Sequence, residues 1–165
     1  MVSDVVLYPE PRPTTQVPLN TLRESVVYLT RTLQQEIAMA MPVTKKMQPG
    51  TLKLSVAITA VGAQTQGLKA RELIPIALVF AAAKAATGNR GKEATIALEW
   101  KLLDSAGELL AMGVRQGVGS ELKKPEGSDD DALVRFENLK PILTDWSNEV
   151  GKAFGNIVIA QSKAK

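Results

Sequence analysis

The amino-acid sequence predicts an α+β fold with two layers: an antiparallel or mixed sheet that carries two amphipathic helices on one face. Two segments, residues 52–60 and 96–102, alternate apolar residues with polar or small ones, as strands with one buried face do. Two others, residues 22–40 and 139–154, repeat apolar residues every three or four positions, as amphipathic helices do. Elements that each have one apolar side are buried most economically as two packed layers.

The hairpin over residues 93–118 is the segment around which the other elements are organised. Asp104 suits the first position of a type I turn, and Gly107 suits the left-handed position of a three-residue loop closed by a bulge. Such a turn places Asp104 opposite Glu108. The register that follows pairs Leu102 with Leu110, Trp100 with Met112 and Leu98 with Val114. Apolar residues then meet on one face, so the pattern and the turn predict the same register.

The first helix is predicted from one apolar stripe that ends before Pro42. A β-branched run at residues 4–8 precedes it as a predicted strand, and four prolines among residues 9–19 predict an extended connection. The stretch Thr21–Glu24 has the pattern of a capping box. The stripe consists of Leu22, Val26, Leu29, Leu33, Ile37 and Ala40. This spacing predicts a helix of about five turns.

The second strand is predicted within residues 43–72. Residues 43–47 are a candidate short strand, and Gln48–Thr51 has proline and glycine at the centre of a type II turn. The inward residues of the strand that follows are Leu52, Leu54, Val56, Ile58 and Ala60. Small or polar residues alternate with them, which predicts that the other face meets water. Residues 62–72 are rich in Gly, Gln and Lys and predict a loop.

The final helix is predicted from a second apolar stripe. Its members are Leu139, Leu143, Trp146, Val150 and Phe154. Asn138 is the predicted N-cap, and Pro141 is tolerated in the first turn. Residues 156–165 predict either a short strand at 157–160 or a frayed tail. No linker or repeat divides the chain, so residues 1–165 are predicted to be a single domain with frayed ends at 1–3 and 161–165.

The composition excludes several classes of functional site. The chain has 165 residues, no cysteine, no histidine and a formal net charge of +3. A zinc site of the usual structural kind, a thiol nucleophile and a Ser-His-Asp triad are therefore excluded. The small positive charge is scattered, which favours solubility over a nucleic-acid interface. We expect no metal, no cofactor and no nucleic-acid partner.

Three polar motifs have ordinary structural interpretations. Gly113–Gly119 lies inside a strand rather than between a strand and a helix, so it does not predict a nucleotide-binding loop. Asp129–Asp131 lacks the alternate spacing of a calcium-binding EF-hand loop. Glu99 and Arg115 are expected to be cross-strand partners on the polar face of the hairpin. The sequence thus gives no catalytic residue, and a hydrolase or transferase that uses Asp, Glu, Lys or Ser is the alternative function.

The apolar segment from Leu73 to Ala83 is the candidate partner-binding surface. Pro75 near its start and Gly88 after its end predict a helix; the alternative is a strand at 74–80 followed by a loop. A helix that is apolar all round is either buried in the core or covered by a second copy, a partner or a membrane surface. It is too short to span a bilayer. The candidate residues are Ile74, Ile76, Leu78, Val79 and Phe80.

Five features together resemble a known family. They are the leading strand Val5–Pro9, the long helix that follows it, the strand Gly50–Ala60, the hairpin Leu102–Ala111 and the final helix with Asp145 and Trp146. Over residues 5–154 the chain resembles the uncharacterised proteobacterial proteins grouped as domain of unknown function 3313, mostly predicted envelope lipoproteins.

The resemblance implies a location at the periplasmic face of a membrane in the bacterial cell envelope. It also implies a secreted precursor with a lipid-bearing cysteine upstream of Met1. Residues 1–4 themselves lack the basic and apolar regions of a signal peptide. The family supplies no catalytic residue. We therefore expect a non-enzymatic binding or assembly module whose partner is another protein or a second copy of the chain.

Overall fold

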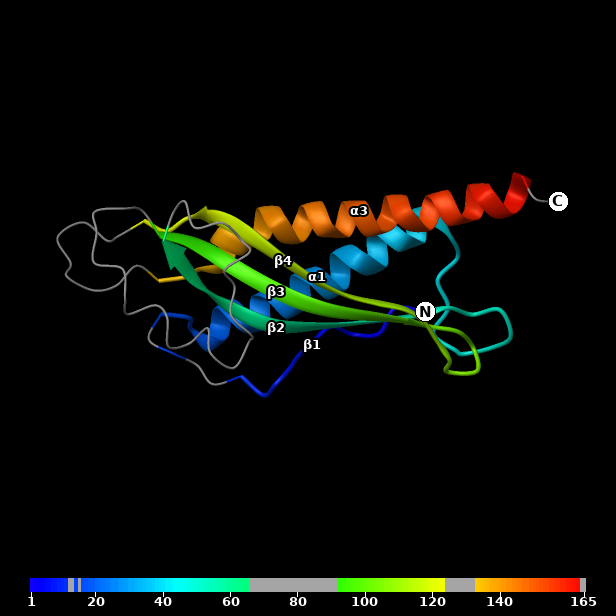
Figure 1. Cartoon of the computed structure of the whole chain (residues 1–165), viewed down its shortest axis with the longest axis horizontal. Coiled ribbons are helices and arrows are strands. Elements are labelled where there is room, and N and C mark those ends of the chain that lie inside the picture. Colours follow the sequence, from blue (N-terminus) through cyan, green and yellow to red (C-terminus); the bar gives the residue numbers. More distant parts are fainter. Residues whose placement is uncertain (12–13, 15, 66–91, 124–132, 164–165) are drawn as a thin grey trace.

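The computed structural model describes residues 1–11, 14, 16–65, 92–123 and 133–163, and it confirms the predicted α+β class. In chain order the elements are β1 (Val6–Leu7), α1 (Leu19–Ala40), β2 (Lys53–Thr65), β3 (Lys92–Leu103), β4 (Leu109–Glu121) and α3 (Phe136–Lys163). The sheet of the described strands has the order β1-β2-β3-β4. β1 is parallel to β2, and the other neighbours are antiparallel, so the sheet is mixed (Figure 1).

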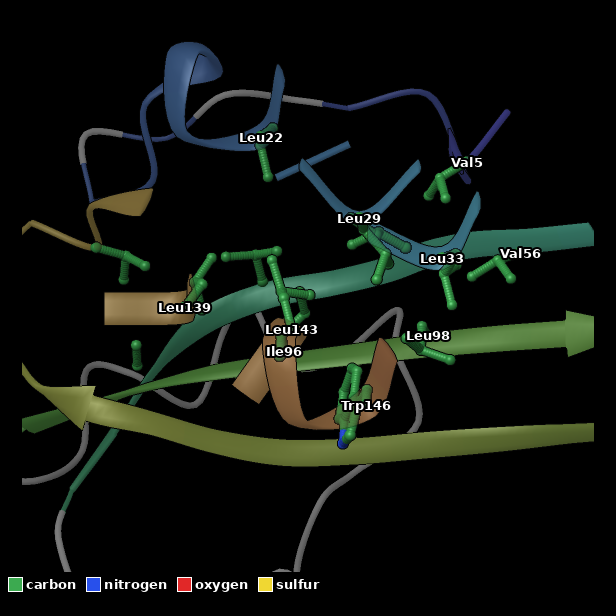
Figure 2. Packing of buried hydrophobic residues seen from close by; sticks show 14 of the residues in the cluster. Val5, Leu22, Leu29, Leu33, Val56, Ile96, Leu98, Leu139, Leu143 and Trp146 are labelled. Carbon is green, nitrogen blue, oxygen red and sulfur yellow. The ribbon is translucent and has the colours of Figure 1, made fainter. Parts of the chain in front are cut away.

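The core lies between one face of the sheet and the two helices. The predicted stripes of both helices are buried in it: Leu29, Leu33 and Ile37 from α1, and Leu139, Leu143 and Trp146 from α3. Figure 2 shows Leu143 and Trp146 pointing from α3 toward β3, the strand that carries Ile96 and Leu98. The two helices are also joined by polar contacts, Tyr28 Oη to Thr144 Oγ1 at 2.7 Å and Thr32 Oγ1 to Ser147 Oγ at 2.8 Å.

The start of α1 differs from the prediction. The helix begins after Pro18, without a side-chain cap, so the capping box at Thr21–Glu24 is not formed. The Thr21 hydroxyl instead donates to the carbonyl of Val134 at 3.0 Å and joins α1 to the segment before α3. The end of the helix at Ala40 confirms the predicted stop before Pro42. Residues 43–47 are not a strand, contrary to the prediction.

α3 is longer than predicted at both ends. It begins at Phe136, so Asn138 lies inside the first turn and is not the N-cap. The Asn138 amide donates to the carbonyl of Glu121 at 3.1 Å, which ties the start of α3 to the end of β4. The predicted strand or tail at residues 157–160 is helix, because α3 continues along α1 with Gly151 beside Glu36 and Gly155 near Ala40.

Both predicted glycine turns are confirmed. Gly107 has φ +88°, and the N–H of Asp104 donates to the carbonyl of Glu108 at 3.0 Å. Gly50 has φ +82°, and the N–H of Thr51 donates to the carbonyl of Gln48 at 2.9 Å. Residues 1–3, where the sequence predicts a frayed end, hydrogen-bond to β2; the N–H of Ser3, for example, donates to the carbonyl of Leu54 at 3.0 Å.

The predicted register of the hairpin is wrong by one residue. Leu103 pairs with Leu109, but Leu102 pairs with Ala111, so Leu110 is the extra residue of a bulge. From there on Trp100 lies opposite Gly113 and Leu98 opposite Arg115. The side chains that the sequence placed in the core, Leu110, Met112 and Val114, are exposed on the other face.

Close packing of α3 on β4 explains this register. A Cβ atom added to Gly117 would lie 1.9 Å from Ile142 Cδ1, and one added to Gly119 would lie 2.1 Å from the carbonyl oxygen of Asn138. Side chains larger than hydrogen cannot occupy the inner row at these positions. The bulge at Leu110 therefore turns the glycine row (Gly113, Gly117 and Gly119) toward α3. It turns the apolar row (Leu110, Met112, Val114 and Val118) toward the outer face.

A second bulge, at Thr59, exchanges the inward and outward faces of β2 over the rest of the strand. Ile58 pairs with Leu98 but Ala60 pairs with Ala97, which leaves Thr59 as the extra residue. Val61 rather than the predicted Ala60 is consequently buried in the core. The strand also extends to Thr65, into the stretch predicted as a loop.

Candidate ligand-binding cavity

The structure does not place the residues that the sequence singled out for function. Ile74, Ile76, Leu78, Val79 and Phe80 lie outside the described residues. The acidic run Asp129–Asp131 lies outside them as well. The described residues contain instead a cavity that sequence reasoning missed.

The cavity lies between the inner face of the sheet and the two helices, and its volume is about 500 Å³. The sheet contributes Leu54, Val56, Leu98, Trp100, Leu102, Ala111 and Arg115. The helices contribute Leu29 and Leu33 from α1, and Trp146, Glu149, Val150, Ala153, Phe154 and Ile157 from α3. With two exceptions these side chains are apolar or aromatic.

The position of the cavity follows from the packing of α3. The first turns of α3 contact the backbone of β4 at Gly119 and Gly117. Farther along α3, from Trp146 onward and toward the start of β4, the helix residues line the cavity instead. The indole of Trp100 lies against Gly113, where an added Cβ would be 2.9 Å from its Nε1. Gly117 and Gly119 thus allow the start of α3 to lie close to the sheet. Nearer the start of β4, at Gly113, the side chain of Trp100 covers the sheet instead of the helix.

The cavity has a buried interior and an exposed mouth. Leu29, Leu33 and Leu98 are almost fully buried and form the interior. Ala153 and Ile157, one turn apart on the last part of α3, are exposed and lie at the mouth. An apolar group can therefore enter from solvent and reach the hydrophobic core.

One ion pair stands at the rim of the cavity. The Arg115 guanidinium donates to the Glu149 carboxylate, with both side chains about half exposed. The Arg115 Cζ atom also lies 5.5 Å from the centroid of the Trp146 ring, within the range of a cation–π contact. The predicted partnership of Arg115 with Glu99 is wrong, because the register shift places Arg115 on the inner face while Glu99 faces outward opposite Val114.

The lining is suited to hold an apolar molecule. Among the described residues, no group of three or more acidic side chains is arranged to hold a metal ion. Sequence reasoning missed the site because its residues have the spacing of core residues. The signal in the sequence that could have revealed the site is the row of glycines in β4, Gly113, Gly117 and Gly119.

Comparisons with known proteins place the chain in a family. The profile of the family described as protein of unknown function DUF3313 matches residues 1–150. The uncharacterised lipoprotein YdcL of Escherichia coli K12 is 31% identical over 146 residues, and its counterpart in strain O157:H7 is equally similar. These alignments cover 88% of this chain and 64% of each relative, so the chain spans less than two thirds of their length.

The family resemblance predicted from the sequence is thereby confirmed. In the part of the chain that the structure describes, neither helix combines the length and apolarity that crossing a bilayer requires. The relatives are named lipoproteins, and lipoproteins are attached to the cell envelope by their lipid. The chain belongs to the DUF3313 family.

Proposed function

We propose that this chain is the ligand-binding module of an envelope lipoprotein and that it holds one apolar chain, such as the acyl tail of a lipid. The observation that carries this proposal is the apolar cavity of about 500 Å³ between the sheet and the helices. Pockets that bind small molecules have volumes of about 300–1,000 Å³. The space opens to solvent beside the exposed residues Ala153 and Ile157, so a ligand can occupy it without displacing the described core.

The expected affinity follows from the area that an acyl chain would bury. Each buried methylene contributes about 0.8 kcal/mol to the binding free energy. An acyl chain with about 14 buried methylenes would therefore contribute about 11 kcal/mol. Association costs at least about 4 kcal/mol in lost freedom of motion. The remaining 7 kcal/mol, roughly, corresponds to a dissociation constant on the order of 10 μM.

The rim is suited to the polar end of such a ligand. Arg115 has five N–H donors, more than its contact with Glu149 uses. An anionic head group near the mouth would therefore find a donor without displacing Glu149. Because the pair is half exposed, we expect the head group to change affinity only modestly.

The same pair supports binding rather than catalysis. Arg115 and Glu149 are the charged side chains among the described residues that line the cavity, and they neutralise each other. General acid–base catalysis requires a group that can exchange a proton with the reacting atom. The Glu149 carboxylate instead accepts a hydrogen bond from the Arg115 guanidinium, and the remaining lining residues have no ionisable group.

Both tryptophans of the chain line the cavity, so intrinsic fluorescence can report its occupation directly. The experiment titrates the protein with a fatty acid that is brominated in mid-chain, a quencher that acts at contact distance. The unbrominated fatty acid is the control for indirect effects. The variant Ala153→Phe narrows the mouth, and Ala38→Phe, at an exposed alanine of α1 outside the cavity, is its matched control.

We expect saturable quenching with a dissociation constant on the order of 10 μM. Ala153→Phe should weaken it at least tenfold, whereas Ala38→Phe should leave it unchanged. If the brominated chain does not quench, or quenches both variants equally, the cavity is not the binding site and the proposal is wrong.

A further inference from the structure

We propose that two copies of this chain associate edge to edge through β4, with the two strands antiparallel about a twofold axis at Val114. The surface involved is the outer edge of β4 and the sheet face opposite the helices. The inference is thus independent of the proposed ligand, which lies on the inner face.

The first observation is an apolar row that covers the outer face of β4. Leu110 is 54% exposed, Met112 66%, Val114 62% and Val118 38%. Beside them on β3 the outward residues are Lys101, Glu99 and Thr95, with the small buried residue Ala97 opposite Gln116. The apolar row is therefore a local exception at one edge, and exposed apolar groups of this kind mark interaction surfaces.

The second observation is the length and lack of protection of the edge. β4 has 13 residues, and no described strand pairs with its outer side. Natural edge strands are usually short or carry lysine, proline or inward charges that prevent further pairing. β4 contains no lysine or proline, and its charged residues are Arg115, which faces the cavity, and Glu121 at the end.

The third observation is that β4 is complementary to itself. Antiparallel pairing about Val114 aligns residues 109–119 of one copy with 119–109 of the other. On the outer face this register pairs Val114 with Val114, Leu110 with Val118, and Met112 with Gln116. On the inner face it pairs Arg115 with Gly113, which leaves room for the guanidinium. An axis at residue 115 would instead place the two arginines opposite each other, and like charges at directly opposed positions are unfavourable.

The size of this contact predicts a weak dimer. Eleven residues of strand are about 37 Å long, and a sheet is about 10 Å thick, so each copy contributes about 370 Å² of edge. A total of about 740 Å² lies below the standard interface of about 1,600 Å² and in the range of transient contacts. We therefore expect a monomer–dimer equilibrium with a dissociation constant on the order of 100 μM.

Because these 165 residues contain no cysteine, single-cysteine variants can test the register. Val114→Cys places two thiols directly opposite each other at the axis. Met112→Cys, at a position of equal exposure, places them four residues apart, about 13 Å. A short thiol–thiol cross-linker should therefore join Val114→Cys into a covalent dimer but not Met112→Cys. The double variant Met112→Cys/Gln116→Cys should be joined again.

Sedimentation of the 165-residue chain tests the association itself. Val114→Lys should weaken the dimer at least tenfold, because it places two ammonium groups at the axis. Val27→Lys, at an equally exposed valine of α1, should leave the dimer unchanged. A wild-type chain that is monomeric up to millimolar concentration, equal effects of the two lysine variants, or equal cross-linking of the two single-cysteine variants would each overturn the proposal.

Discussion

Replacing Gly119 by alanine is expected to destabilise the fold by about 2 kcal/mol. The new Cβ would lie 2.1 Å from the carbonyl oxygen of Asn138, far closer than atoms can approach. That oxygen belongs to the first turn of α3, which the Asn138 side chain ties to Glu121. Because a backbone atom cannot rotate away, we take the upper end of the cost of overpacking, about 3 kcal/mol. Alanine also lowers the conformational entropy of the unfolded chain relative to glycine, which offsets about 0.7 kcal/mol of this cost.

Gly62→Ala is the matched control, since Gly62 also lies within a strand. Its added Cβ would meet Thr95 Oγ1 at 3.7 Å, an ordinary contact, so we expect a gain of about 0.4–1 kcal/mol. Urea unfolding followed by circular dichroism measures both variants. In a thermal scan, Gly119→Ala should lower the melting temperature by about 4–8 °C.

Gly117→Ala tests whether the destabilisation depends on which atom of α3 the added Cβ meets. Its added Cβ would meet the flexible end of Ile142 at 1.9 Å, but also the ring of Trp146 at 2.8 Å. The cost of Gly117→Ala should fall when Ile142 is also changed to alanine, and a double-mutant cycle measures this coupling. If Gly119→Ala and Gly62→Ala shift stability equally, close helix packing does not explain the register of β4.

Two further substitutions test the turn and the bulge. Gly107→Val should destabilise by about 1–2 kcal/mol, because a β-branched residue is strained at φ +88°; urea unfolding measures this, and an unchanged midpoint would contradict the turn geometry. Thr59→Val should stabilise by about 1 kcal/mol, since the buried Thr59 hydroxyl has no hydrogen-bond partner in the described part of the chain. A loss of stability in Thr59→Val would show that this hydroxyl is satisfied in solution.

The helices, the main strands and the turns are predictable from local patterns in the sequence. The apolar stripes of α1 and α3 have the helical period, and the buried residues Leu29, Leu33, Leu139 and Leu143 all belong to them. Gly50 and Gly107 identify turns, because each supplies a positive φ that other residues rarely adopt. These signals depend on neighbouring residues, so they can be read without knowledge of the rest of the fold. Together with the family resemblance, they were enough for the class of fold.

The side of β4 that faces the core depends on contacts between elements that are distant in the sequence. A strand has a period of two, so one bulged residue exchanges its faces completely. The local pattern favoured Met112 and Val114 inside, but α3 approaches so closely that only the glycine row fits beneath it.

The candidate site also depends on which face of β4 is turned toward the helices. Turning β4 over placed Arg115 at the rim of the cavity and exposed the apolar row on the outer face. The lining residues follow the same stripes as the filled core. Whether those stripes close on each other or leave a cavity depends on the distance between α3 and the sheet. That distance is fixed by contacts between residues remote in sequence, such as Gly119 with Asn138 and Gly117 with Ile142, which no local pattern records.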